Sequence, residues 1–181
     1  RNFHDQGELK KLLTGLNKII DKKKIKCPIT IKISPDIKDD EISKIIDLVS
    51  SHNIKGIVVS NTTDSNRNNL SDIKKHESGG LSGQPLKDIS TKLIKRFYKE
   101  TKGKIKIIGV GGVDSGQSAY EKITAGADAV QLYTGMVYKG PGIVKEIKKD
   151  LISILKKENI RNISEAVGIN AWPCYLQELY N

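Results

Sequence analysis

Four short runs rich in β-branched residues, separated by segments with helical periodicity, constrain the fold of this chain more than any other feature. Apolar residues at helical spacing predict an amphipathic helix over residues 6–25, ahead of the first run. Strict alternation of strands and helices predicts a parallel sheet with helical crossovers. The runs cover residues 28–34, 54–61, 104–112 and 128–134. The later helices are expected to begin near Asp39, at Pro85, after a capping Ser115, near Ile143 and at a capping Ser164.

Small or polar residues follow every predicted strand, which is how a (β/α)8 barrel builds its active site. A complete barrel has eight strands and about 250 residues. Four strands are predicted here, and no strand precedes the first helix. We therefore expect residues 1–168 to form the second half of a TIM barrel, and assign no role to the tail, residues 169–181.

The composition favours a soluble globular chain with a solvated basic surface. The 181 residues carry a formal charge of +10, but the lysines are spread along the sequence. The tightest cluster, Lys22–Lys24, ends a predicted helix, where cations suit the helix dipole. We expect no nucleic-acid partner. The start of the chain shows neither an initiator Met nor a signal peptide, and no apolar run approaches the roughly 20 residues of a membrane span.

Glycine-rich and polar turns after the last two strands indicate a phosphate site. Gly111 and Gly112 follow the third strand, and Leu132–Gly135 follows the fourth. Barrel loops at these positions often hold a phosphate with main-chain N–H groups, which glycine allows to approach closely. The alternative is that the two glycines only make a tight turn.

The first two strands offer a cation and a row of hydrogen-bonding side chains. Lys32 lies in the middle of a strand, so its ammonium either faces a ligand inside the barrel or extends to the rim. Ser60–Thr63 is suited to an amide-like or carboxylate substrate, or is simply a polar loop start. The Gly-rich stretch 77–83 ends a long segment, residues 62–84, that fits a lid or binding loop or ordinary flexibility.

No metal site is expected, because the three histidines do not cluster and no carboxylate pair stands at the strand ends. Cys27, just before a strand, is expected to be a small core residue. No general base is evident, so the catalytic base lies outside these residues or the chain is not catalytic.

Five motifs in matching order and spacing resemble class 2 dihydroorotate dehydrogenases, the membrane-associated, quinone-dependent type. The resemblance runs from Arg1 to about Gly168 and corresponds to the C-terminal half of that family. The GGLSGxPL stretch is the most specific. The motifs are IKISPD at 31–36, VSNTT at 59–63, ESGGLSGQPL at 77–86, IGVGGV at 108–113 and QLYTG at 131–135.

The resemblance implies an enzyme that oxidises dihydroorotate to orotate with FMN, in pyrimidine biosynthesis. It places Lys32 near N1 and O2 of the flavin ring, where a cation stabilises the reduced form. Asn61 and Thr62 would bind the pyrimidine. The family more often has Thr where Ser60 stands, which keeps the hydroxyl. The FMN-binding residues implied are Lys32, Ser60, Gly83, Gly112, Tyr133 and Thr134.

The same resemblance implies that the catalytic serine, the first four strands and the membrane helices that admit quinone precede Arg1. It suggests the cytoplasmic face of a bacterial inner membrane, or the mitochondrial inner membrane in a eukaryote. Two alternatives stay open at this point. One is another flavin-dependent, phosphate-binding or aldol-type barrel enzyme, and the other is a non-catalytic half-barrel that needs a partner chain or nucleic acid.

Overall fold

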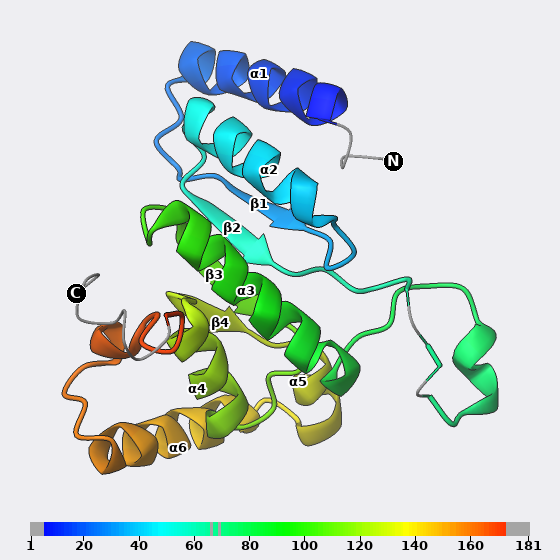
Figure 1. Cartoon of the computed structure of the whole chain (residues 1–181), viewed down its shortest axis with the longest axis vertical. Helices are drawn as coiled ribbons and strands as arrows, with labels where there is room; N and C mark the ends of the chain where they lie inside the picture. Colours follow the sequence, from blue (N-terminus) through cyan, green and yellow to red (C-terminus); the bar gives the residue numbers. More distant parts are fainter. Residues whose placement is uncertain (1–5, 66, 69, 173–181) are drawn as a thin grey trace.

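A computed structural model describes residues 6–65, 67, 68 and 70–172 and contains a sheet of four parallel strands (Figure 1). The spatial order of the strands is their order in the chain, as in a segment of a (β/α)8 barrel. The predicted parallel sheet with helical crossovers is confirmed. The strands are β1 (Thr30–Ile33), β2 (Gly56–Val59), β3 (Lys106–Val110) and β4 (Ala129–Gln131).

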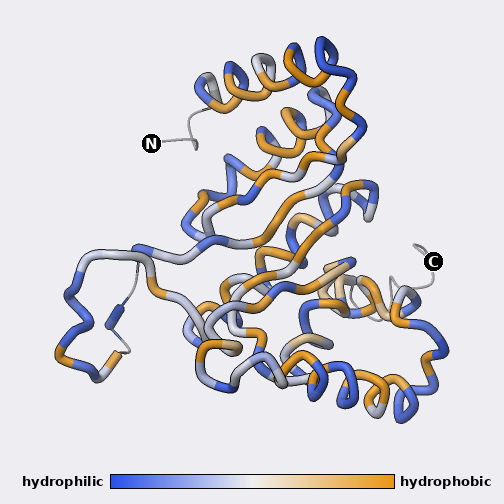
Figure 2. The backbone as a smooth tube through the Cα atoms, turned by 180° about the vertical axis from the view of Figure 1, so that it is seen from behind, coloured by the Kyte–Doolittle hydropathy of each residue, from blue (hydrophilic) through white to orange (hydrophobic). Residues whose placement is uncertain are grey.

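Helices connect the strands and lie against the sheet and against one another. Figure 2 shows hydrophobic and hydrophilic residues alternating along the first and the last long helix, as expected of amphipathic helices. The α-helices are α1 (Gln6–Lys23), α2 (Asp39–Ser51), α3 (Lys87–Thr101), α4 (Gly116–Ala125), α5 (Thr134–Lys139) and α6 (Ile143–Lys157). The 3-10 helices are η1 (Ile73–His76), η2 (Gln84–Leu86) and η3 (Ile163–Ala166).

One face of the sheet carries the main core. Ile33, Ile57 and Ile107 point to this face and are buried in one cluster with residues of α1, α2 and α3, among them Leu13 and Phe97. Alternate residues of a strand face opposite sides of the sheet, so the apolar positions of each strand set its orientation.

The opposite face has far less cover among the described residues. Strand pairing brings Lys32, Val58, Ile108 and Ala129 into one row across this face. Val58 is buried, Ile108 is half-buried, and the two edge positions are exposed. In a closed barrel this face is the interior. Lys32 is therefore on the inner side of the strand, which the sequence left undecided.

Several sequence expectations need correction. Cys27 is exposed rather than part of the core, because it lies in the connection before β1. Asn162, not Ser164, caps the last helix; its side-chain oxygen accepts a hydrogen bond from the Ser164 N–H. The short helix α5, which separates β4 from α6, was not predicted. The expected Ser115 cap of α4 is confirmed, since its hydroxyl accepts from the Ser118 N–H.

The described start of the tail continues along α4. The N–H of Asn170 donates to the carbonyl of Thr124 at 2.9 Å, and Ala171 is buried. The remaining tail, residues 173–181, lies outside the described residues. Over the described parts of the chain, none of the helices has the length and apolar character needed to cross a bilayer.

Candidate active site

A pocket of about 540 Å³ opens at the carboxyl ends of the four strands. It is lined by Lys32 of β1 and by residues that follow β2, β3 and β4, as in the active sites of (β/α)8 barrels. Its volume lies within the range of about 300–1,000 Å³ that is usual for small-molecule sites. Every site residue expected from the sequence lines this one pocket: Lys32, Ser60, Asn61, Thr62, Gly83, Gly112, Tyr133 and Thr134.

The wall formed by β1 and β2 holds its polar groups in fixed places. The Ser60 N–H donates to the carbonyl of Val110 and the Asn61 N–H to the carbonyl of Ile33 at 2.7 Å, so both neighbouring strands hold this turn. The buried Ser60 hydroxyl donates to the Asn61 carbonyl. The Asn61 side chain is exposed. The ammonium of Lys32 has no hydrogen-bond or ion-pair partner among the residues described, so it is free to meet an anionic or electron-rich ligand.

The turn after β3 brings main chain against the pocket. Gly111 and Gly112 have φ angles of +112° and +69°. A Cβ on Gly112 would lie 2.6 Å from the Cβ of Lys87 and 2.8 Å from its Cα, so no side chain fits there. Glycine at this turn is therefore required by conformation and by space, which also permits the close approach of a phosphate.

The last wall is formed where the loop before η2 meets the start of α5. The hydroxyls of Ser82 and Thr134 lie 2.9 Å apart. Gly83 has a φ of +80°, and a Cβ there would lie 2.9 Å from Cγ2 of Thr134. Tyr133 is exposed, and its carbonyl accepts from the N–H groups of Met136 and Val137. This wall of the pocket is thus formed by two segments that lie about 50 residues apart in the sequence.

Asp36, just after β1, anchors the start of the long segment 62–84. Its Oδ1 accepts hydrogen bonds of 2.5 Å from the hydroxyls of Thr63 and Ser65, and its Oδ2 accepts from the Asp64 N–H at 3.0 Å. Burial raises the pKa of Asp36, but the hydrogen bonds from Ser65, Thr63 and Asp64 outweigh it and leave the pKa below its ordinary value.

The remainder of the segment forms an arm that projects from the sheet (Figure 1). Thr63 and Leu81 pair as a short antiparallel bridge at its base. Within the arm, the guanidinium of Arg67 donates to the carbonyls of Lys75, Glu77 and Gly79. The segment is thus a closed loop held at its base, and its Gly-rich end returns to the pocket, where Gly80 abuts the Thr62 side chain.

Two features of the pocket's surroundings were missed from the sequence. Asp114 follows the two glycines and accepts from the Gln84 side chain and from the Ser118 hydroxyl, while its carbonyl accepts from Lys139. Lys122 of α4 is fully buried behind the same turn. A lysine in an otherwise ordinary helix pattern carries no sequence signal of burial.

The chemistry of the lining residues fits a flavin mononucleotide. Main chain at the Gly111–Gly112 turn and the start of α5 suits the phosphate, and Lys32 provides a cation farther across the pocket. The carboxylate of Asp114 is engaged by two hydrogen bonds, which makes it a poor general base. Among the described residues, no group of three or more His, Cys, Asp and Glu side chains could hold a metal ion.

Comparison with known proteins gives one consistent family. A family model described as "Dihydroorotate dehydrogenase" matches residues 1–155. The curated "Dihydroorotate dehydrogenase (quinone)" of Trichodesmium erythraeum is 43% identical over 176 residues, which cover 93% of this chain and 46% of that protein. The mitochondrial protein of the same name from Mus musculus is 39% identical over 174 residues, covering 94% and 44% respectively.

A solved structure shares the fold. The crystal structure of DHODH from Eimeria tenella in complex with ferulenol has a TM-score of 0.88 and 34% sequence identity, and the match covers 96% of this chain and 50% of that one. The expectation of a partial TIM barrel is confirmed. The chain spans about half the length of the curated relatives that it matches.

Proposed function

Because this chain belongs to the dihydroorotate dehydrogenase family, we propose that it forms the FMN-binding half of a quinone-dependent enzyme of that family. The reaction is the oxidation of dihydroorotate to orotate, a step of pyrimidine biosynthesis, with quinone as the final electron acceptor. The observation that carries the proposal is the pocket itself, in which all eight residues implied by the family motifs lie together although they come from four strands and their loops.

The residues around the turns after β3 and β4 support the phosphate end of this assignment. Gly112, Tyr133 and Thr134 hold the FMN phosphate through main-chain N–H groups and the threonine hydroxyl. Gly83 lets the loop before η2 pack on Thr134 and close this end of the pocket. Ser60, which follows β2 and is buried, completes the FMN site.

Lys32 and the polar turn after β2 serve the reacting end. When bound, FMN would supply the redox chemistry of the reaction. The Lys32 ammonium, which no described side chain neutralises, would place a positive charge beside the flavin ring and so favour its reduced form. Asn61 and Thr62 bind the pyrimidine, because their exposed side chains offer donors and acceptors at the pocket mouth.

The sparsely covered face of the sheet fits a second half that completes the barrel and brings the catalytic serine. Parallel strands are ordinarily covered on both faces, and β1 and β4 both have an unpaired edge among the described residues. An N-terminal membrane segment outside this chain would deliver quinone, at a bacterial inner membrane or the mitochondrial inner membrane. The scattered lysines support no nucleic-acid partner.

The test is to produce the complete barrel that contains this chain and to measure its flavin and its activity. We expect stoichiometric FMN and dihydroorotate-dependent quinone reduction. FMN without turnover of dihydroorotate would indicate another flavin-dependent barrel enzyme. A folded barrel without flavin would overturn the proposal.

A further inference from the structure

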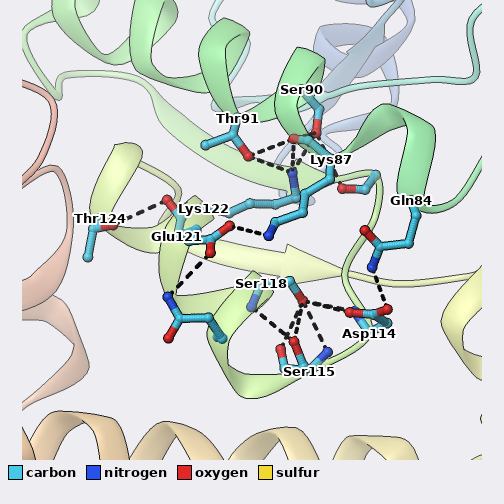
Figure 3. A network of polar contacts seen from close by, with 12 residues as sticks. Gln84, Lys87, Ser90, Thr91, Asp114, Ser115, Ser118, Glu121, Lys122 and Thr124 are labelled. Carbon is cyan, nitrogen blue, oxygen red and sulfur yellow. Dashed lines mark hydrogen bonds and ion pairs between the residues drawn. The ribbon is translucent and has the colours of Figure 1, made fainter. Parts of the chain in front are cut away.

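Lys122 of α4 is a buried cation that the proposed chemistry does not use. The residue has no exposed surface, and its Nζ donates to the Ser90 hydroxyl at 2.5 Å, the Thr91 hydroxyl at 3.1 Å and the Lys87 carbonyl at 3.3 Å (Figure 3). An ammonium has three donors, and each finds an acceptor on the first turn of α3. The neighbouring Glu121 carboxylate is taken by the Lys87 ammonium at 2.8 Å.

Burying a charged amine among neutral oxygens is costly, and a leucine or methionine would fill the same space without that cost. The position of the acceptors shows what the lysine does. All three belong to one helical turn, which lies directly behind the Gly111–Gly112 turn.

Lys122 is connected to the Gly111–Gly112 turn in two ways, and the first is through the hydroxyl of Ser90. Its hydroxyl has two possible acceptors, the Lys87 carbonyl at 3.3 Å and the Gly111 carbonyl at 3.4 Å. The Lys87 carbonyl accepts from the Thr91 hydroxyl at 2.7 Å and from Lys122, and as the first residue of α3 it also receives the main-chain N–H four residues on. The Ser90 hydroxyl lies at a similar distance from both carbonyls and meets less competition at Gly111. Lys122 thus fixes the hydroxyl that holds the carbonyl of the turn.

The second connection between Lys122 and the turn is through the main chain of Lys87. Gly112 packs so closely on the main chain of Lys87 that an added Cβ would lie 3.0 Å or less from three of its atoms. Lys122 holds the carbonyl of that same residue. Its aliphatic stem also fits under β3, where a Cβ on Gly109 would come within 3.2 Å of its Cδ.

We propose that Lys122 is a positioning residue, which holds the Gly111–Gly112 turn in the conformation that binds the FMN phosphate. This inference rests on the proposed function, in which the turn contacts that phosphate. Loss of Lys122 should therefore weaken only the binding of the phosphate group, because other residues line the part of the pocket assigned to the flavin ring.

The experiment compares FMN with riboflavin, which has the same ring but no phosphate. Lys122→Met in the complete barrel should weaken FMN binding about tenfold, as for loss of a hydrogen bond to a charged group. The affinity for riboflavin should stay within about twofold of wild type. Both are measured by quenching of flavin fluorescence on apoprotein. Lys92→Met, which removes an exposed charge from α3, the helix that carries the acceptors of Lys122, is the matched control and should change neither affinity.

Ser90→Ala gives a second, milder test if Lys122→Met does not fold. It removes the link to Gly111 and leaves the ammonium two acceptors, so FMN binding should weaken about threefold with riboflavin unchanged. Equal losses for both flavins, or no loss for FMN, would overturn the positioning role. A folded wild-type barrel that binds neither flavin would instead overturn the proposed function.

Discussion

The hydroxyls of Ser82 and Thr134 lie 2.9 Å apart and join the loop that follows β2 to the first residue of α5. This contact closes the pocket at the end assigned to the phosphate. Both residues line the pocket. We expect Thr134 to contact the phosphate as well as to hold the loop, and Ser82 mainly to hold the loop.

Two substitutions separate these roles. Thr134→Val keeps the shape of the side chain and should weaken FMN binding by about 2 kcal/mol, the range for a hydrogen bond to a charged group. Ser82→Ala removes the same interresidue contact and should cost about 1 kcal/mol or less. Titration of apoprotein with FMN measures both. Equal effects would mean that Thr134 acts only through the loop.

A second prediction concerns the glycine turn after β3. Gly112→Ala should destabilise the protein and reduce flavin occupancy, because the new Cβ meets the Lys87 main chain. Gly140→Ala is the control for a positive φ, since Gly140 has a φ of +73°, with a ψ of 177°, against a φ of +69° for Gly112, but open space around it.

The control gives the cost of a positive φ without overpacking, which is about 1–3 kcal/mol for a non-glycine residue in a sparsely populated region. Gly112→Ala should lose a further ~1–3 kcal/mol from overpacking. Thermal unfolding and flavin absorbance per protein measure the two effects. Equal losses of stability at the two sites would contradict the tight contact with Lys87.

The strands and their order were predictable from the sequence because the β-branched runs are short, apolar and bounded by turn residues. The same periodicity could not tell which way Lys32 points, since one polar residue fits either face of a strand. Pairing with Val58, and burial of Ile33 and Ile57 on the other face, decide it.

Contacts between residues far apart in the sequence could not be predicted from it. Asp36 binds hydroxyls 27 and 29 residues away, and Lys122 binds α3 more than 30 residues away. Cys27 was wrongly expected in the core because residue type was used without the position of its loop. Gly109 indicates a close neighbour inside its strand, but Ile94 and Ala127 lie there as well as Lys122, so the glycine did not indicate a buried lysine.

The third prediction tests the cation at the reacting end. Lys32→Met should slow reduction of bound flavin by dihydroorotate about 100-fold, a typical loss for one electrostatic contact to developing charge, while FMN stays bound. Lys106→Met is the control, because Lys106 lies on the same face of the sheet but pairs with Asp128 at 2.7 Å. Rapid-mixing absorbance at the flavin band measures both. An unchanged rate would remove Lys32 from the mechanism.

The fourth prediction concerns Asp36, which fixes the base of the projecting arm. Asp36→Asn removes the charge that accepts from Thr63 and Ser65, so trypsin should cut faster within the arm, at Lys74 or Lys75. Asp64→Asn, whose side chain is exposed, is the control.

The lowered pKa of Asp36 gives this contact a pH dependence. Its stabilisation is present above the ordinary value of 3.8 and is lost as the pH falls through the lower folded value. An acid-stable protease should therefore cut the wild-type arm as readily as the Asn variant at low pH. A difference between the two that persists there would contradict the role of the carboxylate.

The last prediction follows from burial of Lys122, which lowers its pKa from 10.5 to about 8. Below pH 8 the lysine is protonated in the folded and the unfolded chain alike. Between about pH 8 and 10.5 the unfolded chain binds more protons than the folded one. The free energy of unfolding should therefore rise with pH across this window, by roughly 3 kcal/mol in total.

Denaturant unfolding of the complete barrel at several pH values measures this rise. Lys122→Met should lack it, whereas Lys92→Met should keep it. Other lysines contribute a pH dependence of their own, including Lys87, whose pKa the Glu121 carboxylate raises. Because those lysines are present in both proteins, the difference between wild type and Lys122→Met isolates the buried amine. Parallel stability curves for the two proteins would show that Lys122 keeps an ordinary pKa and is not buried as a cation.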